Sequence, residues 1–112
     1  MAQASLWLLR HAQPLIAPGV CYGQLDVPAD PSATLQAGMR FAAAMPGSAM
    51  VRHSPLQRCE QLALSLQAPE AFLSMDARLQ EMDFGRWEGQ SWNDIGRAAV
   101  DAWSQDLYAH AP

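Results

Sequence analysis

The sequence has no excess of basic charge, no long apolar run and no recognisable leader. Its formal net charge is −4 at pH 7, which argues against non-specific binding of nucleic acid. No apolar run approaches the ~20 residues that are needed to cross a bilayer. The start of the chain, residues 1–5, lacks the basic residues and the long apolar stretch of a signal peptide. We therefore expect a cytoplasmic protein that binds neither nucleic acid nor membranes.

Cysteine is scarce, and so are the other signs of a metal site. The two cysteines, Cys21 and Cys59, form no CxxC pair and have no histidine nearby at ligand spacing. This argues for two reduced thiols rather than a disulfide or a zinc site. Nothing else in the sequence indicates a metal or an organic cofactor, so we expect neither.

The chain also lacks internal repeats, linkers and low-complexity tracts. Half of its 112 residues are apolar and only 16% are charged, which excludes a disordered chain. A second domain would not fit in this length, whereas one domain of this size can bury a real core. We expect a single domain over residues 1–112.

Three short apolar runs have the composition of buried parallel strands. These runs are residues 6–9, 49–51 and 71–73. Helix signals lie between and after them, namely a capping residue followed by proline at 30–31 and 54–55, and a serine cap at 91. Apolar residues recur at helical spacing in each predicted helix: Leu35, Met39 and Ala42; Leu56, Cys59, Leu62 and Leu66; Trp92, Ile95, Ala99, Trp103 and Leu107.

Strands that alternate with helices predict an α/β fold around a mostly parallel sheet. Three strands make a thin sheet, which indicates that part of the fold is missing. In open α/β sheets, ligands bind at the carboxyl ends of the strands. Two predicted strand ends here carry residues that suit phosphate: Arg10-His11 at the first, and Ser54 with Arg58 at the second.

A phosphate site would follow from simple chemistry at these two strand ends. A helix N-terminus at Ser54 favours an anion, and each arginine offers a planar fork for phosphate oxygens. An imidazole kept neutral by two guanidiniums can attack phosphorus. Each feature alone has an ordinary structural explanation, as surface polarity, a helix cap, a solvated arginine or a solvated acid.

Four segments, in order along the chain, resemble the motifs of one family. They are Leu9-Arg10-His11-Ala12-Gln13-Pro14, the segment 21–28 (CYGQLDVP), the segment 54–59 (SPLQRC) and the segment 81–89 (EMDFGRWEG). They resemble the histidine phosphatase (phosphoglycerate mutase-like) superfamily, and bacterial α-ribazole phosphatase-like members most of all. The resemblance implies a three-layer phosphoglycerate mutase-like fold, of which this chain corresponds to the N-terminal portion.

The resemblance also implies roles for individual residues. His11 would be the nucleophile that becomes phosphohistidine, and Glu81 would be the acid that protonates the leaving oxygen and then activates water. That role requires Glu81 to be partly buried and protonated near neutral pH, and Asp83 is a rival for it. The remaining site residues would bind the phosphate or the substrate: Arg10, Arg58, Gln13, Tyr22, Gly23 and Ser54.

Three departures from the family pattern affect the expected function. Ala12 stands where the family has glycine, so the backbone there must tolerate a β-carbon. The family's second active-site histidine, on a later strand, has no counterpart, because His110-Ala111 follows a predicted helix instead. His53 precedes Ser54, where members more often have a small polar residue. Without later strands, an apolar strand edge favours pairing with a second copy as a homodimer.

The sequence therefore predicts a metal-independent phosphomonoester hydrolase that acts through His11 on a small phosphorylated metabolite. The residues after the nucleophile, Gln13-Pro14-Leu15, favour a phosphatase over a mutase. One alternative is a catalytically inactive histidine-phosphatase fragment that at most binds phosphate or a partner. A second is an unrelated small α/β binding domain.

Overall fold

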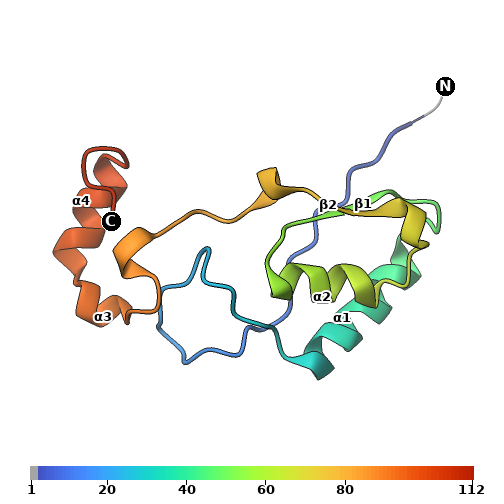
Figure 1. The fold of residues 1–112 in the computed structure, drawn as a ribbon, viewed down its shortest axis with the longest axis horizontal. Coiled ribbons are helices and arrows are strands. Elements are labelled where there is room, and N and C mark those ends of the chain that lie inside the picture. Colours follow the sequence, from blue (N-terminus) through green and yellow to red (C-terminus); the bar gives the residue numbers. More distant parts are fainter. Residues whose placement is uncertain (1–2) are drawn as a thin grey trace.

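The computed structural model describes residues 3–112. Two parallel strands and two packed helices form one end of the molecule, and two further helices form the other (Figure 1). The helices are α1 (Pro31–Ala44), α2 (Gln57–Ser65), α3 (Trp92–Ile95) and α4 (Arg97–Gln105), the strands are β1 (Val51–His53) and β2 (Leu73–Met75), and three 3₁₀ turns are η1 (Glu70–Phe72), η2 (Ala77–Leu79) and η3 (Gly85–Trp87). None of the described helices is both long and apolar enough to span a bilayer.

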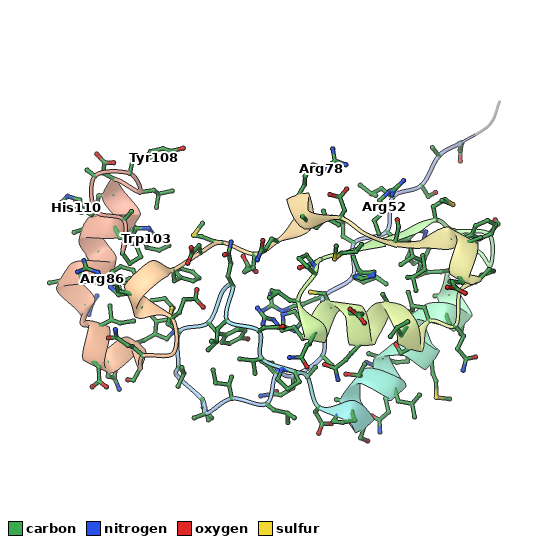
Figure 2. The ribbon with its side chains drawn as sticks, viewed as in Figure 1. Arg52, Arg78, Arg86, Trp103, Tyr108 and His110 are labelled. Atoms are coloured by element: carbon green, nitrogen blue, oxygen red, sulfur yellow. The ribbon has the colours of Figure 1, made fainter. Side chains whose placement is uncertain are left out.

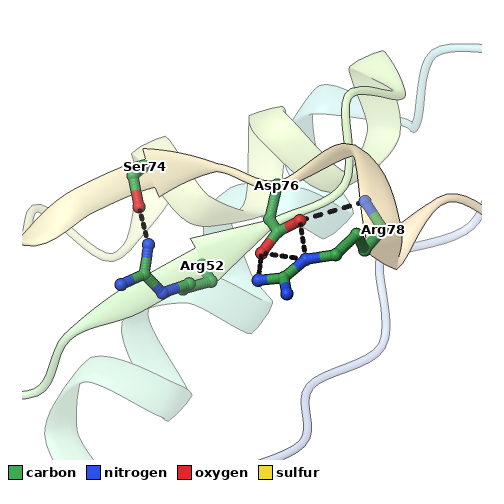
Figure 3. A network of polar contacts seen from close by, with 4 residues as sticks. All are labelled: Arg52, Ser74, Asp76 and Arg78. Atoms are coloured by element: carbon green, nitrogen blue, oxygen red, sulfur yellow. Dashed lines mark hydrogen bonds and ion pairs between the residues drawn. The ribbon is translucent and has the colours of Figure 1, made fainter.

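The α/β class and the parallel sheet are confirmed, since β1 and β2 pair in parallel with Val51 opposite Leu73 and His53 opposite Met75. Figure 3 shows one polar contact between the two strands and a second just after β2. Arg52 Nη1 donates to Ser74 Oγ at 2.8 Å. Just beyond β2, hydrogen bonds from Arg78 lower the pKa of Asp76 to about 2.

The predicted strand at residues 6–9 is wrong. These residues are extended, but none is paired in a sheet, and Leu6 and Leu8 are 84% and 85% exposed. A strand needs a hydrogen-bonded neighbour, and among the described residues β1 pairs only with β2. The other two strands form two residues later than predicted, at 51–53 and 73–75, the latter because residues 70–72 turn as η1.

The predicted first helix is confirmed, since the Asp30 carboxylate accepts a hydrogen bond from the Ala33 N–H at 2.8 Å and Pro31 is the first helical residue. Its apolar spacing nevertheless predicts the wrong face. Leu35 and Met39 are 55% and 65% exposed. The buried residues of α1 are small: Thr34, Ala37 and Gly38. Small residues let α1 approach α2 closely.

The C-terminal helix predicted from Ser91 is divided in two. Ser91 does cap it, because its Oγ accepts from the Asn93 N–H at 3.1 Å. Gly96, with φ of +90°, separates α3 from α4, since that backbone conformation is open mainly to glycine. Four rings pack edge to face in this part of the chain, and we call them the tryptophan cluster: Phe84, Trp87, Trp92 and Trp103.

A long loop, residues 11–30, joins the two ends of the molecule (Figure 1). Its two arms are tied together where Leu15 N–H donates to Pro28 O, at 2.8 Å. Its middle is tied to the C-terminal segment, since Cys21 N–H donates to Gln90 O at 2.7 Å and Cys21 O accepts from Gly89 N–H at 2.8 Å. These contacts bring residues 20–25 beside residues 84–91.

Replacing Gly38 by alanine should destabilise the protein. A β-carbon at Gly38 would overlap the side chain and backbone of Ser65 on α2. Overpacking of this kind costs about 1–3 kcal/mol of unfolding free energy, measured by urea denaturation. Gly47→Ala is the matched control, because a β-carbon there meets nothing within 4 Å. Equal stability of the two variants would contradict the close helix contact.

Candidate active site

His11 follows the extended segment 6–10 and is half-buried. Its Nδ1 lies 2.8 Å from the carbonyl oxygen of Ala12. Because a carbonyl oxygen only accepts hydrogen bonds, the neutral ring must carry its proton on Nδ1, which leaves the lone pair on Nε2. Ala12 is not among the residues with positive φ, so alanine is accommodated at this position without backbone strain.

The electrostatic surroundings of His11 keep its ring neutral. Burial, the largest effect, lowers the pKa of His11 from 6.5. The hydrogen bond to Ala12 acts in the opposite direction, as does the negative charge of Glu81. The positive charges of Arg58 and Arg10 lower the pKa further. Both guanidiniums and one carboxylate therefore lie within electrostatic reach of an imidazole that is neutral at pH 7.

Two cavities meet at His11. The first, of about 390 Å³, is an open hollow lined by residues 10–14 and 16–20 together with Tyr22. Of the residues predicted from the sequence, this cavity brings together Arg10, His11, Gln13 and Tyr22. The second, of about 490 Å³, lies between residues 5–9 and β1, and His53 and Ser54 contribute to its wall.

Arg58 is the most deeply buried charge described, with 1% of its surface exposed. Its Nη1 donates to Leu25 O at 2.7 Å and its Nη2 to Gly23 O at 2.5 Å. The guanidinium lies 5.1 Å from the centre of the Tyr22 ring, a favourable cation–π arrangement. Nε has no hydrogen-bond partner among the described residues. Arg58 thus holds loop carbonyls with two nitrogens and keeps one buried donor unused.

The N-terminus of α2 is not open to a ligand as predicted from Ser54-Pro55. The helix begins at Gln57, and Ser54 Oγ accepts a hydrogen bond from Leu56 N–H at 3.3 Å. The Gln57 N–H donates to the Asp26 carboxylate at 2.7 Å. A carboxylate of the chain itself therefore occupies the favourable position at this helix start.

The two candidate acids lie in the loop before η3. Glu81 is exposed, so the expectation that it is partly buried is wrong. Its carboxylate accepts from the Met82 N–H at 2.9 Å, and nothing in the loop covers it. The Asp83 carboxylate accepts from the Gly85 N–H at 2.8 Å, which fixes it in a local turn.

The other two histidines differ in their relation to this site. His53 ends β1, and its Nδ1 lies 2.8 Å from Ser54 O. It shares the second cavity with His11. His110 lies beside α4, at the end of the molecule away from the strands (Figure 2), and its N–H donates to Asp106 O. As expected from its context, His110 is not part of the site around His11.

Sequence analysis assigned no role to Glu88, which the structure places against the predicted residue Gly23. Its carboxylate accepts hydrogen bonds from Gly23 N–H at 2.9 and 3.1 Å. Asp26, which caps α2, was also missed. Both lie in polar loops where an acid is usually solvated, so no spacing or composition signal distinguishes them before the chain is folded.

The described residues offer no obvious site for a metal. Within residues 3–112 no three histidine, cysteine, aspartate or glutamate side chains are placed to hold one ion. Cys21 and Cys59 are free thiols. Burial, followed by the negative charge of Glu88, raises the pKa of Cys21, which makes this thiol a poor ligand and a poor nucleophile.

Solved structures define the fold class. TTHB049 from Thermus thermophilus is 24% identical with a TM-score of 0.70, over 87% of this chain and 55% of that protein. A structure described as mycobacterial hydrolase 1 is 24% identical with a TM-score of 0.69, over 86% and 49%. A mycobacterial glucosyl-3-phosphoglycerate phosphatase complexed with VO3 is 24% identical with a TM-score of 0.66, over 86% and 51%. The fold is phosphoglycerate mutase-like.

The family follows from the sequence match. The model of the histidine phosphatase superfamily (branch 1) matches residues 6–112, and the chain belongs to this superfamily. The chain spans about half the length of the solved structures that it matches. A search of curated proteins finds no match.

NMR titration of the His11 imidazole should give a midpoint below pH 6.5, because burial and two arginines disfavour its charged form. The neutral ring then persists to lower pH than in a free histidine. Arg10→Gln should move the midpoint upward, since it removes a positive charge. Arg40→Gln, on the exposed side of α1, is the control and should leave the midpoint unchanged. A wild-type midpoint above 6.5 would contradict this electrostatic picture.

Proposed function

We propose that this chain is a phosphomonoester hydrolase that acts through a phosphohistidine on His11. The observation that carries the proposal is the state of His11. It is half-buried and neutral, Nδ1 is fixed on Ala12 O, and Arg10 and Arg58 lie within electrostatic reach. A neutral imidazole with a free Nε2 beside two guanidiniums suits attack on a phosphate.

The first step transfers the phosphoryl group. The Nε2 lone pair of His11 forms a bond to phosphorus while the bond from phosphorus to the ester oxygen breaks. Arg10 and Arg58 stabilise the negative charge on the three remaining oxygens. The leaving alkoxide takes a proton from the Glu81 carboxyl and departs as an alcohol. Because Glu81 is exposed in the free protein, this step requires the bound substrate to cover its carboxyl.

The second step restores the enzyme. A water molecule attacks the phosphohistidine, its proton passes to the Glu81 carboxylate, and the P–N bond breaks to release inorganic phosphate. Glu81 suits both steps better than Asp83, because the negative charge of Glu81 reaches His11. The Glu81 carboxylate accepts one hydrogen bond, from the neighbouring Met82 N–H.

The substrate that we propose is a small phosphorylated metabolite. The cavity of about 390 Å³ beside His11 has room for a compact group. Gln13 and Tyr22 lie on its wall. Ser54 lies on the wall of the second cavity, and the Gly23 N–H donates to Glu88. The phosphatase activity named for the mycobacterial neighbour, and the VO3 in its structure, support a phosphate ester as the substrate class.

A second candidate function is an inactive fragment that at most binds phosphate or a partner chain. Two observations favour it. Leu6 and Leu8 are exposed, and β1 has a strand neighbour on one side only among the described residues. Such an edge favours pairing with a second copy of this chain as a homodimer.

Phosphate release from an aryl phosphate, without added metal, distinguishes the two functions. His11→Ala should lower turnover about 10³-fold or more, because it removes the group that carries the phosphoryl group. His110→Ala is the matched control and should retain wild-type turnover, since His110 lies at the far end of the molecule. Turnover that survives in His11→Ala would overturn the mechanism. A wild-type protein that binds vanadate without releasing phosphate would support the inactive fragment.

A further inference from the structure

Glu88 is a half-buried carboxylate that is saturated with backbone hydrogen bonds. Its Oε1 accepts from Gly23 N–H and Leu25 N–H, both at 2.9 Å. Its Oε2 accepts from Gly23 at 3.1 Å, Gln24 at 3.2 Å and Phe84 at 2.9 Å. Gly23, Gln24 and Leu25 are consecutive residues, which we call the 23–25 loop. Glu88 lies more than sixty positions away from this loop in the sequence.

The opposite side of the 23–25 loop is held by Arg58. The N–H groups of Gly23 and Leu25 point to Glu88, while their carbonyl oxygens accept from the guanidinium of Arg58. The loop is therefore fixed between a carboxylate and a guanidinium. Arg58 keeps a buried Nε–H without a partner among the described residues.

The loop is closely packed at Gly23. A β-carbon at Gly23 would overlap Met82 O and would also meet the Phe84 ring and Glu88 Oε2. Burial alone would raise the pKa of Glu88, but the four backbone N–H donors outweigh burial and lower it from 4.5. The group is therefore an anion at neutral pH, and charged hydrogen bonds of this type are the strong ones.

We infer that Glu88 is a positioning residue for the phosphate site. It fixes the 23–25 loop, and the loop carbonyls then fix the guanidinium of Arg58, whose positive charge reaches His11. This inference rests on the proposed function in one respect, that Arg58 binds the phosphoryl group. The contact between Glu88, the loop and Arg58 is independent of any ligand.

The most informative variant is Glu88→Gln. It keeps the shape of the side chain. In the wild type both carboxylate oxygens accept hydrogen bonds from backbone N–H groups, so either orientation of the glutamine amide places its NH₂ group against N–H donors. Glu88→Asp keeps two acceptor oxygens on a shorter stem and should restore part of the effect. Glu70→Gln is the matched control, because Glu70 is exposed in η1 and carries the same charge change.

The first measurement requires no ligand. In Glu88→Gln the amides of the 23–25 loop should exchange with solvent about 10- to 100-fold faster, since each loses a charged acceptor. The NMR resonance of the Arg58 Nε–H should shift as well. Glu70→Gln should change neither. The near-ultraviolet signal of the tryptophan cluster reports whether each variant is folded. A folded Glu88→Gln protein with an unchanged Arg58 resonance would overturn the inference.

The second measurement uses orthovanadate as the probe of the phosphate site. Glu88→Gln should weaken vanadate binding about tenfold, Glu88→Asp less so, and Glu70→Gln not at all. In an Arg58→Ala background, Glu88→Gln should have no further effect, because Glu88 acts through Arg58. Two results would overturn the role of Glu88 while leaving the proposed function in place. One is a tenfold loss of vanadate affinity from Glu88→Gln in the Arg58→Ala background as well, and the other is unchanged vanadate binding in Glu88→Gln when the wild type binds. Failure of the wild type to bind vanadate would overturn the proposed function as well.

Discussion

The 23–25 loop, held between Arg58 and Glu88, is the contact on which the arrangement of the molecule depends. On one side it is attached to α2 through Arg58, and the cap that Asp26 places on Gln57 N–H strengthens that attachment. On the other side it is attached through Glu88 to the turn at Phe84. The end of the molecule built on the strands and the end built on the tryptophan cluster therefore meet at one loop. The Arg58 guanidinium and the Glu88 carboxylate bond mainly to backbone groups of the loop. These hydrogen bonds therefore do not depend on which side chains the loop carries.

This arrangement also determines the chemistry available to His11. A fully buried guanidinium adds to the effect of burial on the imidazole, and both favour the neutral ring. The Ala12 carbonyl directs the ring proton to Nδ1 and leaves the lone pair on Nε2. The exposed carboxylate of Glu81 acts on the imidazole in the opposite direction from the two arginines.

The sheet is the part of the structure least complete by itself. β1 and β2 pair with each other, while residues 6–9 remain extended and unpaired beside a cavity of about 490 Å³. Leucines that a larger sheet would bury are exposed here. Apolar side chains on an unpaired extended segment favour association with another strand. The solved structures of the same fold are about twice as long, which agrees with a fold that is only partly formed by these residues.

Features that depend only on neighbouring residues could be predicted from the sequence. The cap and proline at Asp30-Pro31, the serine cap at Ser91 and the α/β alternation are local signals, and the four motifs identify the superfamily. Local patterns could not predict which strands pair, because a strand exists only with a partner, so residues 6–9 failed to form one. They also could not predict the buried face of α1, which depends on the close approach of α2 at Gly38. Only the tertiary structure brought Glu88 to the 23–25 loop and Asp26 to the start of α2. A carboxylate in a polar loop holds other segments in place only when backbone N–H groups that are distant in the sequence donate hydrogen bonds to it.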